Sequence, residues 1–180
     1  MRPKPPVNYL AGYAPELIAQ VRALIAEQRL PELLRRRYPQ RHAIRTDRAL
    51  YDYVVALKER HLRHAGPLNR VAFDSTLHLT RNALGLHTAK SQPHGAKLKA
   101  KREIRISTLF RDGPPEFLRM IVVHELAHTK EPEHDKAFYQ LCCHIEPDYH
   151  RLEFDLRCYL MWLEASGEAL WGQVMPAATV

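Results

Sequence analysis

Long hydrophobic runs are missing from this chain. No apolar segment approaches the roughly 20 residues that a membrane-spanning helix needs, and residues 1–8 contain no apolar core of a secretory signal. A protein with helical membrane spans is therefore excluded, and we expect a cytoplasmic protein with no membrane partner.

Cysteine is also scarce. The three residues Cys142, Cys143 and Cys158 are an odd number, and the first two are adjacent in a predicted helix. This pattern excludes the disulfide framework of small secreted proteins. We expect the three thiols to be small buried hydrophobic groups. The chain also has no internal repeat.

Charged residues are plentiful but unevenly divided along the 180 residues. Residues 114–180 contain 5 Lys and Arg and 11 Asp and Glu, net −6, whereas residues 1–113 contain 22 and 9, net +13. A basic half favours phosphate-bearing partners such as nucleic acid or nucleotides, and a soluble basic surface explains it as well. With 46% hydrophobic residues, the length predicts a single domain over residues 1–180, with a catalytic core at about 69–166.

The most informative stretch is residues 124–128, which read His-Glu-x-x-His inside an apolar run. At about 100° per residue, His124 and His128 lie on one side of a helix, one turn apart, so both imidazoles can bind one cation. Glu125 follows the first ligand, where its carboxylate can act as the catalytic base on a water molecule. The pattern indicates metal-dependent hydrolysis with one Zn²⁺. Two surface histidines beside a glutamate are the alternative.

A third metal ligand is expected at His134. A continuous helix would place it about 15 Å from His124 along the axis, so the chain must turn back. Pro132 favours such a turn, because a proline disfavours helical backbone at the residue before it. The spacing equals that of the metzincin pattern, but Glu131 stands where that pattern has glycine. A downstream carboxylate is the alternative third ligand: Glu146, Glu153 or Asp155.

Hydrophobic periodicity predicts an α+β fold. We expect helices over about 15–30, 32–38, 46–64, 116–130, 137–145 and 147–166, and strands over 69–79, 86–89 and 97–106. N-terminal helices thus precede a small antiparallel or mixed sheet, and the C-terminal helices carry the motif.

The last predicted strand carries a basic ridge. Ile104 and Ile106 are expected to point inward, with these charged residues outward: Lys97, Lys99, Lys101, Glu103 and Arg105. The ridge could hold an anionic substrate, or it could prevent an exposed edge strand from pairing with other chains. We favour the second interpretation slightly.

These stretches together resemble the YgjP-like metal-dependent hydrolases. The resemblance is carried by residues 117–128 (Phe-Leu-Arg-Met-Ile-Val-Val-His-Glu-Leu-Ala-His), 134–139, 146–149, 82–89 and 95–101. It implies a zincin-like metallopeptidase domain related to the WLM and SprT-like groups, with zinc on His124, His128 and His134 and with Glu125 catalytic. It also implies a link to pyrophosphatase activity on UTP, which is associated with the YgjP branch.

Three functions follow from this pattern. We favour a zinc-dependent hydrolase of the metallopeptidase type acting on a peptide or protein, in which Tyr149, His144 or His150 could stabilise the oxyanion. The first alternative is a nucleotide (UTP) pyrophosphohydrolase that holds phosphates with the basic strand. The second is a non-enzymatic zinc protein associated with nucleic acid.

Overall fold

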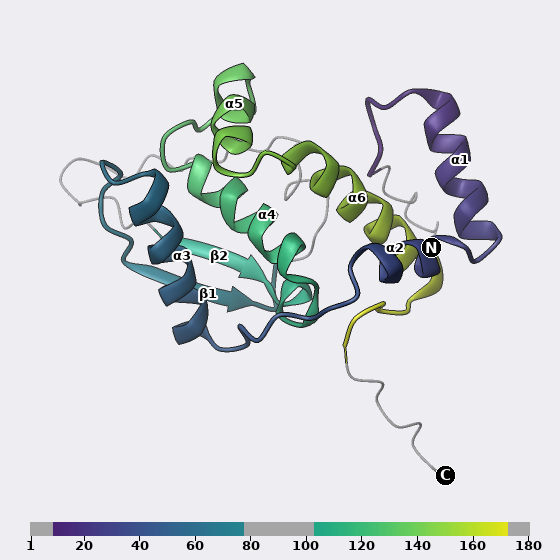
Figure 1. Ribbon diagram of the computed structural model, residues 1–180, viewed down its shortest axis with the longest axis horizontal. Helices are drawn as coiled ribbons and strands as arrows, with labels where there is room; N and C mark the ends of the chain where they lie inside the picture. Colours follow the sequence, from purple (N-terminus) through teal and green to yellow (C-terminus); the bar gives the residue numbers. More distant parts are fainter. Residues whose placement is uncertain (1–8, 78–102, 173–180) are drawn as a thin grey trace, which may run out of the picture.

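Six α-helices and one two-stranded sheet make up the described part of this computed structural model, residues 9–77 and 103–172 (Figure 1). The first three helices are α1 (Pro15–Ala26), α2 (Leu30–Arg37) and α3 (Asp47–His61). The strands β1 (Arg70–Asp74) and β2 (Glu103–Ser107) follow, and β2 continues into the short 3₁₀ helix η1 (Thr108–Asp112). The last three helices are α4 (Pro115–Ala127), α5 (Lys136–Ile145) and α6 (Tyr149–Ser166). The expected α+β class is confirmed.

Local sequence signals account for most helix ends. Thr46 caps α3 by accepting a hydrogen bond from the backbone N–H of Ala49 at 3.2 Å. Pro15 and Pro115 begin α1 and α4, where a proline lacks only a donor that the helix does not use. Gly167 ends α6 with a φ of 72°, a left-handed conformation that glycine adopts without strain.

The sheet joins segments that are far apart in sequence. β1 and β2 are parallel, with Val71 opposite Ile104 and Phe73 opposite Ile106. These four side chains are buried, and Arg105 is exposed on the other side of β2. The predicted alternation of β2 is therefore confirmed over its described residues, and a wholly antiparallel sheet is wrong.

The first strand is shorter than expected. It ends at Asp74, whose carboxylate accepts hydrogen bonds from the backbone N–H and the hydroxyl of Thr76, both at 2.7 Å. This side-chain turn competes with a further strand residue. Ala72, whose side chain points away from those of Val71 and Phe73 in a strand, is buried as well. The strand predicted at 86–89 and the lysines of the basic ridge lie outside the described residues.

Helix α4 lies between the sheet and the C-terminal helices. It contacts β2 on one side and both α5 and α6 on another, while α3 packs on β1 and α2 on α6 (Figure 1). Met120, Val122, Val123 and Leu126 of α4 are fully buried. The motif is therefore built on the most enclosed helix of the fold, where packing holds its backbone firmly.

The states of the cysteines and the lengths of the described helices bear on two features that are scarce in the sequence, disulfide bonds and long apolar segments. All three cysteines are free; Cys142 and Cys158 are buried and Cys143 is half-buried. Burial raises the pKa of both Cys142 and Cys158 to about 12, which keeps these thiols protonated. No helix within the described ranges is long and apolar enough to span a membrane. The cytoplasmic location and the domain limits stay predictions.

Candidate metal centre

The first two histidines of the motif lie at the C-terminal end of α4. His124 is 2% exposed within the last turn, and His128 is the residue that ends the helix. The helix stops three residues earlier than expected. The reason is that the N–H of Thr129 and its hydroxyl both turn back to the carbonyl of Leu126, at 3.0 and 2.6 Å, which closes a tight final turn.

The chain then reverses, as the proline predicts. The N–H of Glu131 bonds to the carbonyl of Ala127 at 2.8 Å, and Pro132 follows. The next helix is started by Asp135, whose carboxylate accepts a hydrogen bond from the N–H of Phe138 at 3.0 Å. His134 lies directly before this cap and is returned toward α4.

The three imidazoles converge through the same ring nitrogen. The Nε2 atoms of His124 and His128 are 3.2 Å apart, those of His128 and His134 are 3.0 Å apart, and those of His134 and His124 are 3.1 Å apart. A tetrahedral ion with bonds of about 2.0–2.1 Å would have ligand nitrogens roughly 3.3 Å apart, so the spacing fits a metal of zinc's size. We call this cluster the imidazole triad.

A single aromatic ring supports all three imidazoles. Phe138 of α5 is fully buried, and its ring centroid lies 5.0, 4.6 and 4.7 Å from those of His124, His128 and His134. No local pattern in the sequence indicates that Phe138 contacts every member of the triad. It restricts the rotamers of the three rings at once.

Hydrogen bonds on the opposite ring nitrogens orient two of the imidazoles. The Nδ1 atom of His124 lies 2.7 Å from the hydroxyl oxygen of Tyr149, and that of His128 lies 3.1 Å from the carbonyl oxygen of Glu131. A carbonyl only accepts, so Nδ1 of His128 carries the proton and its Nε2 lone pair faces the triad. Such outer partners are typical of metal-binding histidines.

Burial keeps these rings neutral. It holds the pKa of His124 well below its ordinary value, with the neighbouring imidazoles adding to the effect, and it also lowers the pKa of His128. Neutral imidazole is the form that binds a metal.

Glu125 is half-buried on α4, next to His124. Burial raises the pKa of its carboxyl to about 7. Desolvation of this kind disfavours the charged form and is common among catalytic carboxyl groups.

None of the three downstream carboxylates belongs to the triad. Glu146 pairs with Arg119, Glu153 with Arg157 at 2.6 Å, and Asp155 with Arg37 at 2.7 Å. Within residues 9–77 and 103–172, the triad is the one group of three or more potential ligands close enough to share an ion. The alternative of a carboxylate third ligand is therefore not supported.

The expected oxyanion donors lie elsewhere. Tyr149 contacts the Nδ1 side of His124, away from the converging Nε2 atoms. The ring of His144 faces that of His61, with 6.4 Å between the ring centroids. His150 is exposed, and its ring centroid lies 5.4 Å from that of Tyr139. No spacing rule links His124 to a tyrosine 25 residues later, so this contact could not be predicted from the sequence.

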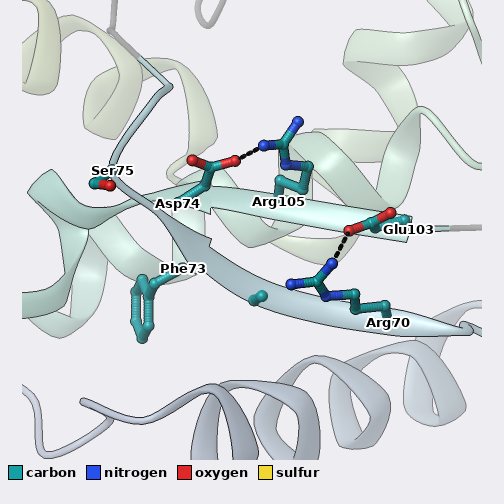
Figure 2. A pocket seen from close by; sticks show the side chains of 7 residues that line it. Arg70, Phe73, Asp74, Ser75, Glu103 and Arg105 are labelled. Carbon is teal, nitrogen blue, oxygen red and sulfur yellow. Dashed lines mark ion pairs between the residues drawn. The ribbon is translucent and has the colours of Figure 1, made fainter.

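The charged face of the sheet forms a second polar region (Figure 2). A cavity of about 470 Å³ lies here, lined by residues of both strands and by Ser75, which follows β1. Arg105 pairs with Asp74, and Arg70 pairs with Glu103 at 3.3 Å. We call these four residues the sheet pocket. The positive charges of its two arginines are thus balanced by carboxylates of the same pocket.

The chain belongs to the YgjP-like family. The model of this family, described as "YgjP-like, metallopeptidase domain", matches residues 59–159, a range that contains both strands, α4, the triad and Tyr149. The resemblance seen in the sequence is confirmed.

A curated relative is the UTP pyrophosphatase of Escherichia coli (strain K12). It is 59% identical over 157 residues, which are 87% of this chain and 94% of the relative. No solved structure gives a significant match. Family and relative both indicate a hydrolase, and the domain together with the triad points to a metal ion.

Proposed function

We propose that this protein is a zinc-dependent hydrolase that cleaves a phosphoanhydride bond of a nucleoside triphosphate such as UTP. The convergence of three Nε2 atoms to within 3.2 Å of one another is the observation that supports metal-dependent chemistry most directly. The nucleotide substrate is supported by the name of a relative that is 59% identical over most of both chains.

His124, His128 and His134 are the proposed ligands of one ion. Each ring presents Nε2 to one shared point, and burial lowers the pKa of His124 and His128, which favours the neutral imidazole that binds a metal. Three imidazoles favour zinc or a similar transition metal, whereas Mg²⁺ prefers carboxylates and water. When bound, the ion would supply Lewis-acid chemistry that makes water more nucleophilic near neutral pH.

Glu125 is the proposed general base. Its support is its place beside His124 on α4, in the pattern in which two histidines one turn apart hold the ion and the glutamate acts on water. In this role the carboxylate takes a proton from the attacking water and returns it on the leaving-group side.

The proposed reaction balances without a further reactant. The oxygen of water forms a bond to the α-phosphorus, and the anhydride bond to the bridging oxygen breaks. Pyrophosphate leaves with that bonding pair, the nucleoside monophosphate keeps the new oxygen, and the proton passes through Glu125 to the leaving oxygen or to solvent.

Peptide hydrolysis is the second candidate, and it was the function that the sequence favoured. The family's description as a metallopeptidase domain supports it. The same residues would serve, with water attacking a carbonyl carbon and Glu125 returning the proton to the leaving amine. The relative's name, UTP pyrophosphatase, favours a nucleotide over a peptide as the substrate. A non-enzymatic zinc protein is disfavoured, because both comparisons indicate a hydrolase.

One experiment separates these functions. The purified protein is incubated with UTP or with an unfolded protein, each with and without added Zn²⁺, and pyrophosphate and new amino termini are measured. We expect zinc-dependent release of pyrophosphate. Glu125→Gln should keep stoichiometric zinc and lower kcat by about 10²–10⁴-fold, whereas Glu32→Gln, an exposed change on α2, should not.

Each other outcome points to a definite alternative. Unchanged turnover in Glu125→Gln excludes this residue as the base. Cleavage of the unfolded protein with UTP left intact favours the peptidase. If neither substrate is consumed and salt-sensitive DNA binding appears, the non-enzymatic function gains support.

A further inference from the structure

We propose that Tyr149 is a positioning residue for metal binding, which holds His124 in the tautomer and orientation that present Nε2 to the ion. This inference rests on the proposed metal site, and it assigns Tyr149 a role different from the oxyanion donor that the sequence suggested.

The contact between the two residues is short and enclosed. The hydroxyl oxygen of Tyr149 lies 2.7 Å from Nδ1 of His124, and the two rings are nearly parallel, with centroids 6.4 Å apart and 16° between their planes. Tyr149 is fully buried and His124 is 2% exposed. Water therefore cannot easily replace the hydroxyl as a partner of this nitrogen.

The hydrogen bond selects a tautomer. A neutral imidazole has one protonated nitrogen, and metal binding through Nε2 requires the proton on Nδ1. Nδ1–H then donates to the hydroxyl oxygen of Tyr149. The buried thiol of Cys142 also interacts with this hydroxyl, which offers a place for the hydroxyl's own proton.

Contacts from α4, the helix that carries His124, also fix the position of Tyr149 at the start of α6. Arg119 of α4 forms an ion pair with Glu146 and donates a hydrogen bond to the carbonyl of Ile145 at 3.0 Å, which ties α4 to the end of α5. The carbonyl of Glu146 in turn accepts a hydrogen bond from the N–H of Tyr149 at 2.9 Å. Tyr149 begins α6 at this point, so the turn between α5 and α6 fixes the tyrosine against His124.

The two oriented ligands differ in a way that permits a test. The outer partner of His128 is a backbone carbonyl, which no substitution removes. The outer partner of His124 is a side-chain hydroxyl, and Tyr149→Phe deletes it while keeping the ring and its packing.

The test measures the affinity for Zn²⁺ itself, by competition with a chromophoric chelator and without substrate. Tyr149→Phe should bind zinc about 10–100-fold more weakly than the wild type, the usual effect of losing such an outer partner. Tyr139→Phe is the matched control, because it removes a hydroxyl from a neighbouring ring at 6.3 Å from Tyr149, and it should bind zinc as the wild type does. Circular dichroism of both variants checks that they fold.

NMR of the zinc-loaded wild type gives a second readout that needs no variant. It should show a slowly exchanging proton on Nδ1 of His124, and Tyr149→Phe should lose its protection from exchange. An unprotonated Nδ1 in the wild type overturns the inference, as does a Tyr149→Phe variant with wild-type affinity. A wild type that binds no zinc overturns the proposed function itself, so the two failures are distinguishable.

Discussion

The imidazole triad and the sheet pocket are both polar, but their charges are organised in opposite ways. In the triad, three ligand nitrogens of the same kind converge on one point in a partly buried setting, with Nε2 atoms 3.0–3.2 Å apart. In the sheet pocket, each arginine faces a carboxylate on the neighbouring strand, at an exposed surface. The charges of the pocket are paired with one another, whereas the triad presents three ligand nitrogens to one shared point.

This difference distinguishes a cluster suited to binding a ligand from a set of ion pairs that stabilises the sheet. Opposite charges that pair across two strands hold those strands together and need no ligand. Three imidazole nitrogens that converge on one point in a partly buried cluster are an arrangement that a bound cation would stabilise, which supports the proposed metal site.

Removal of a triad member should give the largest effect. His128→Ala takes away one of three nitrogens that face the same point, so the protein should no longer retain stoichiometric zinc through gel filtration, as measured by elemental analysis. His150→Ala, which removes an exposed imidazole of α6, should retain the metal. Equal retention by the two variants would contradict the triad as the binding site.

Loss of the ring behind the triad should affect both stability and metal. Phe138→Ala should lower the free energy of unfolding by about 3–5 kcal/mol, because a fully buried phenyl ring leaves a cavity. It should also weaken zinc binding. Phe154→Ala, at a partly buried ring that packs on Tyr13 instead, should cost less stability and leave the affinity unchanged. Urea denaturation and chelator competition measure the two quantities.

Metal removal should weaken the whole fold by a moderate amount. At a free zinc concentration 100 times the Kd, binding to the folded state alone adds about 2.7 kcal/mol to the free energy of unfolding. Chelation should therefore lower the thermal midpoint reversibly, and zinc should restore it. A midpoint that does not respond to zinc would argue against a site formed by folding.

The sheet pocket should give the smallest effect. Arg70 and Glu103 form an exposed pair at 3.3 Å, so Arg70→Ala should change the free energy of unfolding by less than about 1 kcal/mol. The KM for UTP should also stay the same. A KM raised tenfold or more by Arg70→Ala or Arg105→Ala would instead assign the pocket to the substrate and would break the contrast with the triad.

The triad was predictable because its signals are local. His124 and His128 are one helical turn apart, and Pro132 predicts the end of the helix and the turn that brings His134 back to them. The burial of Ile104 and Ile106 followed from an equally short pattern, the alternation of apolar and charged residues along the strand.

The features that sequence reasoning missed depend on distant contacts. Arg70 pairs with Glu103 in a parallel register across 33 positions, and no local pattern sets the direction of that pairing. The early end of β1 depends on the side-chain turn at Asp74. Tyr149 contacts His124 because α6 starts beside α4. The ion pair between Arg119 and Glu146 holds the turn before α6 against α4.

X-ray absorption spectroscopy of the zinc-loaded protein tests the central claim most directly. Three imidazole nitrogens at about 2.0–2.1 Å from the ion, with one further light ligand and no sulfur, are the predicted result. A thiolate in the coordination sphere, fewer than three imidazoles, or a protein that takes up no transition metal would contradict it.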